Sequence, residues 1–150
     1  MGGGLHSSPL LRRSLPKSVA SRTADWRGVC NDRSVARILI VDDDGRFRGI
    51  APRLLESEGF DVVGEAQDGE AAVAAARQLE PDIVLLDVQL PDIDGFEVAE
   101  RLAAEGARPA VVFTSTRDES DFGPQLYRDG VRGFVPKDEL SAERIASLCR

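Results

Sequence analysis

The sequence predicts an α/β protein built on a parallel sheet with helices on both faces. Short apolar runs recur along the chain, segments with helical periodicity separate them, and Gly, Pro or Asp marks most boundaries. Continuous apolar runs are typical of strands buried on both sides, as happens when helices connect parallel strands. The 150 residues are enough for one such domain.

Five strands are expected, each a short run of mainly apolar residues. The run ILIV ends in three consecutive aspartates, and the run IVLL ends directly at Asp87. Parallel strands joined by helices are expected to have right-handed crossovers. The expected ranges are 38–41, 61–66, 83–86, 110–113 and 133–135.

Helical segments follow the strands, and two prolines predict local irregularities. Pro52 lies inside the first segment, which is expected to kink or to begin only near this residue and to end at Gly59. Gly123-Pro124 interrupts the fourth segment and predicts a short helix that ends at Asp129. The other helices are expected over 70–79, 95–105 and 139–149.

Composition divides the chain into two regions. Residues 1–35 have no regular period and contain six Lys or Arg against two Asp, so we expect a disordered basic N-terminal arm. Residues 36–150 contain 13 basic and 24 acidic side chains, which argues against direct nucleic-acid binding by the folded part. No apolar run approaches the ~18 residues of a membrane span. The distant Cys30 and Cys149 indicate neither a disulfide framework nor a metal motif and favour a reducing cytoplasm.

Polar side chains follow four of the expected strands. Ligands of an open parallel sheet bind beyond the carboxyl ends of its strands. If these four strands lie side by side, their terminal groups converge. The groups are Asp42, Asp43 and Asp44 after the first strand, Asp87 after the third, Thr114 and Ser115 after the fourth, and Lys137 just after the fifth.

This set of groups suits phosphoryl chemistry. Packed carboxylates repel one another, and a divalent cation relieves that repulsion. Oxygen ligands without His or Cys favour Mg²⁺. Mg²⁺, a lysine and a hydroxyl together stabilise the oxygens of an incoming phosphoryl group, and a carboxylate can act as its nucleophile.

Four motifs in order resemble the response-regulator receiver domain of two-component signalling: ILIVDDD (38–44), IVLLDVQLPDIDG (83–95), VVFTST (111–116) and GVRGFVPK (130–137). The resemblance implies a receiver domain over residues 36–150, with a doubly wound, flavodoxin-like (βα)5 fold and strand order 2-1-3-4-5. It implies a cytoplasmic signalling switch rather than an enzyme, although the switch takes part in its own phosphotransfer and autodephosphorylation.

The resemblance also implies roles for matching residues. Asp87 would accept a phosphoryl group from a phosphohistidine of a sensor histidine kinase or a phosphotransfer protein. Mg²⁺ would be held by Asp43 directly, by Asp42 through water, by Asp87, and by the backbone carbonyl of Gln89, whose side chain would tune hydrolysis of the phosphate. Lys137 would bind a phosphoryl oxygen, Thr114 or Ser115 would be the switch hydroxyl, and Phe134 would be the switch aromatic that turns inward on activation.

The identity of the switch hydroxyl is ambiguous. Counting forward from Pro109 selects Thr114, whereas counting back from Lys137 selects Ser115, because one extra residue lies between them. Gly123-Pro124 is the expected place of that residue. We favour Thr114, because Ser115 then fills the small-residue position that follows the hydroxyl.

Simpler interpretations apply to several other residues. Asp44 is expected to cap the first helix, and Asp92 and Asp94 are expected to be turn residues. Phe134 is interpreted equally well as a core residue. The family often has a cis proline after the lysine; here Pro136 precedes it, so that cis peptide is not expected.

Two alternative functions stay open at this point. One is a phosphatase of the haloacid-dehalogenase type, with Asp42 as nucleophile and Asp44 as acid, which would leave Asp87 unexplained. The other is a receiver-like interaction module that is never phosphorylated. The favoured hypothesis is a stand-alone receiver, because the chain ends at Arg150. Its signal would pass to a downstream protein effector, with no membrane contact and with homodimerisation undecided.

Overall fold

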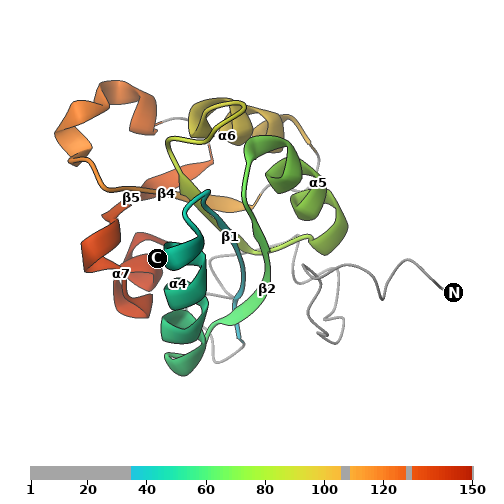
Figure 1. The fold of residues 1–150 in the computed structure, drawn as a ribbon, viewed down its shortest axis with the longest axis vertical. Helices are drawn as coiled ribbons and strands as arrows, with labels where there is room; N and C mark the ends of the chain where they lie inside the picture. Colours follow the sequence, from blue (N-terminus) through green and yellow to red (C-terminus); the bar gives the residue numbers. More distant parts are fainter. Residues whose placement is uncertain (1–34, 106–108, 128–129, 150) are drawn as a thin grey trace, which may run out of the picture.

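The fold is a five-stranded parallel sheet in the order β2-β1-β3-β4-β5 (Figure 1). The computed structural model describes residues 35–105, 109–127 and 130–149, so all but the last residue of the predicted N-terminal arm lies outside the described residues. The predicted strand order is confirmed. The strands are β1 (Arg37–Val41), β2 (Asp61–Ala66), β3 (Ile83–Asp87), β4 (Ala110–Ser115) and β5 (Val131–Pro136).

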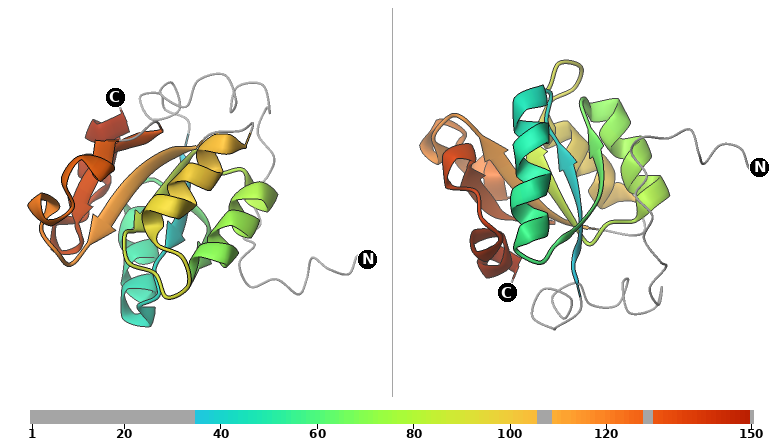
Figure 2. Two further views of the ribbon diagram at one scale, coloured as in Figure 1. Left: turned by 90° about the horizontal axis from the view of Figure 1, so that it is seen from above. Right: turned by 60° about the horizontal axis from the view of Figure 1, so that its bottom comes forward.

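Helices cover both faces of the sheet, which explains why its strands are continuously apolar. Helices α4 (Gly45–Ser57) and α7 (Ala142–Cys149) lie on one face, and α5 (Gly69–Leu79) and α6 (Gly95–Ala104) lie on the other (Figures 1 and 2). Successive strand side chains point to opposite faces. Ile38 and Ile40 therefore join the core beneath α4 and α7, whereas Leu39 joins the core beneath α5 and α6.

Helix α4 begins at Gly45 and runs through Pro52, so of the two predicted alternatives, a kink or a start near Pro52, the late start is wrong. Asp44 caps this helix, as predicted: its side chain accepts a hydrogen bond from the N–H of Arg46. The cap provides a hydrogen-bond acceptor for the first turn of the helix. Pro52 removes only one backbone N–H donor from the helix interior. Pro52 is buried, as are Ala51 and Leu55 on the same helix.

The connection between β4 and β5 differs from the expected short helix. Its described residues form two 3₁₀ turns, η1 (Glu119–Asp121) and η2 (Gly123–Tyr127), and positions 128–129 lie outside the described residues. Gly123 has a φ of 69°, a left-handed conformation that interrupts an α-helix, and Pro124 has no N–H to donate. The last helix also starts later than expected, at Ala142, after a further 3₁₀ turn, η3 (Lys137–Glu139).

None of the helices in the described part of the chain is long and apolar enough to cross a membrane. The described residues also contain no cis peptide bond, so the chain passes through Pro136 in the trans form, in line with the sequence.

Candidate functional site

The carboxyl ends of β1, β3 and β5 bring three carboxylates and one ammonium group together. Asp42 and Asp43 follow β1, Asp87 ends β3, and a carboxylate oxygen of each lies within 4.8 Å of the others. Lys137, which follows β5, places its Nζ 2.7 Å from Asp42 Oδ2 and 3.3 Å from Asp87 Oδ2. Four residues that the sequence singled out therefore converge.

Backbone turns fix the direction of the two buried carboxylates. Oδ1 of Asp42 accepts the N–H of Asp44 at 2.8 Å, and Oδ1 of Asp87 accepts the N–H of Gln89 at 3.0 Å. Both are local turns in which an aspartate bonds the backbone two residues ahead. With Oδ1 held in this way, Oδ2 of each side chain faces the Lys137 ammonium.

Burial and neighbouring charges shift the pKa values of groups in the site. Asp42 is 0% exposed and Asp87 is 4% exposed, whereas Asp43 is exposed. Burial, assisted by the charge of Asp42, raises the pKa of Asp87 to about 6, against the opposing effects of the Gln89 N–H and Lys137. Burial alone would lower the pKa of Lys137, but Asp42 and Asp87 together raise it, so this side chain stays cationic.

The donor set fits Mg²⁺. Its three carboxylates offer only oxygen atoms as ligands, and the positive charge of a single lysine only partly balances their negative charge. A bound divalent cation would relieve the remaining repulsion between the carboxylates. Of the predicted ligands, Asp42, Asp43 and Asp87 form this cluster, while Gln89 is an exposed residue joined to it through its backbone N–H.

The two candidate switch hydroxyls occupy different environments. Thr114 pairs with Asp87 in the β3–β4 register, which places both side chains on the same face of the sheet. Its Oγ1 is buried and donates to the carbonyl of Val135 at 2.7 Å. Ser115 is the next residue of β4, on the opposite face, and its Oγ accepts the N–H of Arg117 at 3.0 Å.

Phe134 lies away from the carboxylates, in the core beneath α5 and α6. Its ring is only 7% exposed and stands 5.9 Å from the ring of Phe122. Phe122 contacts Phe96 at 6.2 Å, and Phe96 contacts Phe113 at 5.1 Å. In this conformation Phe134 is therefore already inside, at the end of a row of four aromatic rings.

Two tertiary contacts, one made by Phe47 and one by Asp92, were missed by the sequence reasoning. The ring of Phe47, on α4, lies 4.9 Å from Lys137 Nζ in a cation–π contact. Asp92, predicted only as a turn residue, accepts the backbone N–H groups of Gly69 and Glu70, and the Gly69 N–H is the main cause that lowers its pKa to about 2. No local pattern could have indicated these contacts, because each joins residues distant in sequence.

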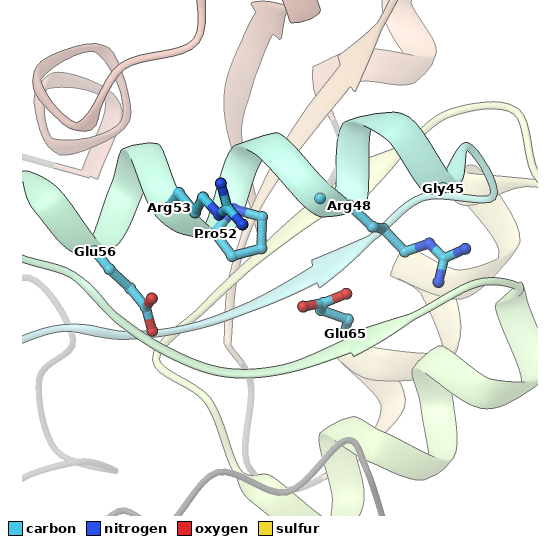
Figure 3. A pocket seen from close by; sticks show the side chains of 7 residues that line it. Gly45, Arg48, Pro52, Arg53, Glu56 and Glu65 are labelled. Carbon is cyan, nitrogen blue, oxygen red and sulfur yellow. The ribbon is translucent and has the colours of Figure 1, made fainter.

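A separate pocket of ≈ 440 Å³ lies between α4 and the edge strand β2 (Figure 3). Glu65 on β2 points toward the helix, opposite Arg48. The charged lining is balanced, with two arginines and two glutamates, and includes no member of the carboxylate cluster. The groups suited to phosphoryl chemistry are therefore those at the strand ends. The lining consists of Gly45, Arg48, Gly49, Pro52, Arg53, Glu56 and Glu65.

Comparison with known proteins identifies relatives for most of the chain. Residues 38–149 match the family model of the response regulator receiver domain. Response regulator GacA of Pseudomonas viridiflava is 35% identical over 113 residues, which cover 75% of this chain and 53% of GacA. The transcriptional regulatory protein PdtaR of Mycobacterium tuberculosis is 34% identical over 121 residues, covering 75% and 59%. This chain therefore spans little more than half the length of these curated relatives.

A solved structure agrees with these matches. The two-component response regulator of the LuxR family from Aurantimonas sp. SI85-9A1 superposes with a TM-score of 0.66 at 32% identity, over 76% of this chain and 86% of its own.

Proposed function

This chain belongs to the response regulator receiver domain family, and from that premise we propose that it is a phosphorylation-controlled switch whose phosphoacceptor is Asp87. The convergence of Asp42, Asp43, Asp87 and Lys137 at one edge of the sheet carries this proposal. A pKa of about 6 leaves the Asp87 carboxylate mostly ionised at neutral pH, as a nucleophile requires.

The proposed reaction is transfer from a phosphohistidine of a sensor histidine kinase or a phosphotransfer protein in the cytoplasm. A carboxylate oxygen of Asp87 forms the new O–P bond while the N–P bond breaks and the imidazole leaves. Lys137, now paired with both buried carboxylates, turns to a phosphoryl oxygen and neutralises part of its charge.

Mg²⁺ would be held by Asp43, Asp87 and the backbone carbonyl of Gln89, with Asp42 acting through water. When bound, it supplies electrostatic stabilisation of the phosphoryl oxygens. The side chain of Gln89, an exposed residue two positions after Asp87, would influence the access of water to the phosphate.

We assign the switch hydroxyl to Thr114, because it lies opposite Asp87 and on the same face. On phosphorylation its Oγ1 would exchange the Val135 carbonyl for a phosphoryl oxygen. That exchange would release the strand next to Phe134, and the row of aromatic rings would carry the change to Phe122, the C-cap residue of η1. Phosphorylation would thereby shift the population between two conformational states of the segment around Phe122, and an effector protein would bind one of them.

The phosphatase alternative is not favoured. It needs Asp44 as an acid, but the Asp44 carboxylate caps α4 by accepting the N–H of Arg46 at 2.9 Å. It also assigns no role to the ion pair between Asp87 and Lys137.

The test is phosphorylation by a small-molecule donor. Wild-type protein is incubated with Mg²⁺ and acetyl phosphate, and intact mass spectrometry is expected to show one added phosphoryl group. Asp87→Asn should show none, while Asp44→Asn serves as a matched control that keeps the adduct. No adduct on wild type, or an undiminished adduct on Asp87→Asn, would contradict the proposal. Hydrolysis of an aryl phosphate that depends on Asp42 but not on Asp87 would support the phosphatase instead.

A further inference from the structure

The loop of residues 88–94, called the acceptor loop below, joins β3 to α6 and begins directly after Asp87. Near its start, the N–H of Val88 donates to the carbonyl of Thr114 at 3.1 Å. At its end, the N–H of Gly95 donates to the carbonyl of Val88 at 2.8 Å. These bonds hold the two ends of the loop, and Gln89 lies between them.

Asp92 connects the middle of the acceptor loop to another helix. Its Oδ1 accepts the N–H of Gly69 at 2.8 Å and its Oδ2 accepts the N–H of Glu70 at 2.9 Å. These are the first two residues of α5, whose own cap, Asp68, accepts the N–H of Ala71 at 2.7 Å. The first N–H groups of a helix have no partner inside it, so a carboxylate from a distant loop can complete its cap.

Shape complementarity reinforces this connection. A Cβ atom added at Gly69 would overlap Cγ1 and Cδ1 of the Ile93 side chain, so a side chain at position 69 would displace Ile93. The adjacent residues Asp92 and Ile93 thus contact the same point of α5, one through hydrogen bonds and one through packing.

We propose that Asp92 is a positioning residue of the phosphoryl site: by anchoring the acceptor loop to the N-terminus of α5, it sets the position of Gln89 and thereby the affinity for Mg²⁺. This inference rests on the proposed function, since Gln89 matters to Mg²⁺ only if the site binds the ion. It adds α5, which contributes no ligand, to the elements that shape the site.

The competing explanation is that Asp92 merely stabilises α5 as a helix cap, and Asp68 provides the matched control. Asp68→Ala weakens the start of the same helix by removing the bond to the Ala71 N–H, and it keeps both hydrogen bonds of Asp92. Asp92→Ala weakens that start and also releases the loop. A role confined to helix stability predicts the same consequences for both variants at the phosphoryl site.

The experiment measures hydrogen exchange of the acceptor-loop amides in Mg²⁺-free protein, and Mg²⁺ affinity by calorimetry. In Asp92→Ala we expect faster exchange at Val88–Leu90 and a Mg²⁺ dissociation constant raised about tenfold, the lower end for groups that orient metal ligands. Asp68→Ala should leave both quantities within about twofold of wild type. Asp92→Asn, which keeps one of the two acceptor oxygens, should show intermediate exchange.

Equal behaviour of Asp92→Ala and Asp68→Ala in loop exchange would overturn the proposal. If Asp92→Ala does not fold, Gly69→Ala tests the same contact from the helix side and should also accelerate exchange in the acceptor loop. Wild-type protein that neither binds Mg²⁺ nor accepts phosphate would refute the proposed function. Wild-type protein that does both, with an unchanged loop in Asp92→Ala, would refute only the anchoring role.

Discussion

Replacing Asp87 by asparagine is expected to stabilise the Mg²⁺-free protein at neutral pH. The Asp87 carboxylate is 4% exposed and shares Lys137 with the buried Asp42. The substitution removes one negative charge from this pair. The asparagine oxygen can still accept the N–H of Gln89, and Lys137 stays paired with Asp42.

The size of the effect follows from the pKa of Asp87, which is raised from 3.8 to about 6, mainly by burial. One pKa unit corresponds to about 1.4 kcal/mol, so ionised Asp87 destabilises the fold by at most about 3 kcal/mol. Water and ions reach the rim of the site and screen part of this energy, which leaves roughly 1–2 kcal/mol.

The sign of the pH dependence follows from proton binding. Between the unfolded pKa and the folded pKa, the folded state binds more protons than the unfolded state, so stability falls as pH rises through this window. The advantage of Asp87→Asn should therefore be absent below about pH 4 and complete above about pH 7.

Urea unfolding of both proteins without Mg²⁺, across this pH range, measures the difference as a shift of the midpoint at constant slope. Adding Mg²⁺ should stabilise wild type, because the ion binds only the folded state, and should have little effect on Asp87→Asn. A variant that is no more stable than wild type at neutral pH, or whose gain does not change with pH, would refute the reasoning. Asp43→Asn is the control, since its carboxylate is exposed and should give a smaller gain.

Two further substitutions test the packing and charge of the site. Lys137→Met removes the cation between Asp42 and Asp87 and should destabilise the Mg²⁺-free protein by up to about 3 kcal/mol. Adding Mg²⁺ should then raise the melting temperature of the variant more than that of wild type. An equal rise in both proteins would contradict this prediction. Gly95→Ala would place a Cβ 2.5 Å from the Asp87 carbonyl oxygen and should cost about 1–3 kcal/mol in urea unfolding. Its control is Gly49→Ala on α4, where an added Cβ meets nothing within 4 Å; this substitution should stabilise the helix by up to about 1 kcal/mol. Equal effects of the two substitutions on the free energy of unfolding would show that position 95 has room for a side chain.

The strands and their terminal residues were predictable because their signals are local. An uninterrupted run such as ILIV or IVLL can be buried only in a sheet covered on both faces, and the residue that ends the run must stand at the carboxyl edge. Asp44 could be predicted as a cap for the same reason, because its partner is only two residues away.

Local signals failed where two effects competed. Pro52 suggested either a kink or a late start of α4, but the Asp44 cap begins the helix at Gly45, before the proline. Gly123-Pro124 correctly indicated a disturbance, yet the described part of this segment contains only 3₁₀ turns.

The sequence by itself determined the sheet, its buried strands and the aspartates and lysine at their ends, because each depends on neighbours along the chain. Only the tertiary structure decided that Thr114 faces Asp87, that Phe47 lies beside Lys137, and that Asp92 caps α5. Each of these contacts joins segments at least 22 residues apart. Their geometry is fixed by strand register and by the free N–H groups of a distant helix, and neither leaves a periodic trace in the sequence.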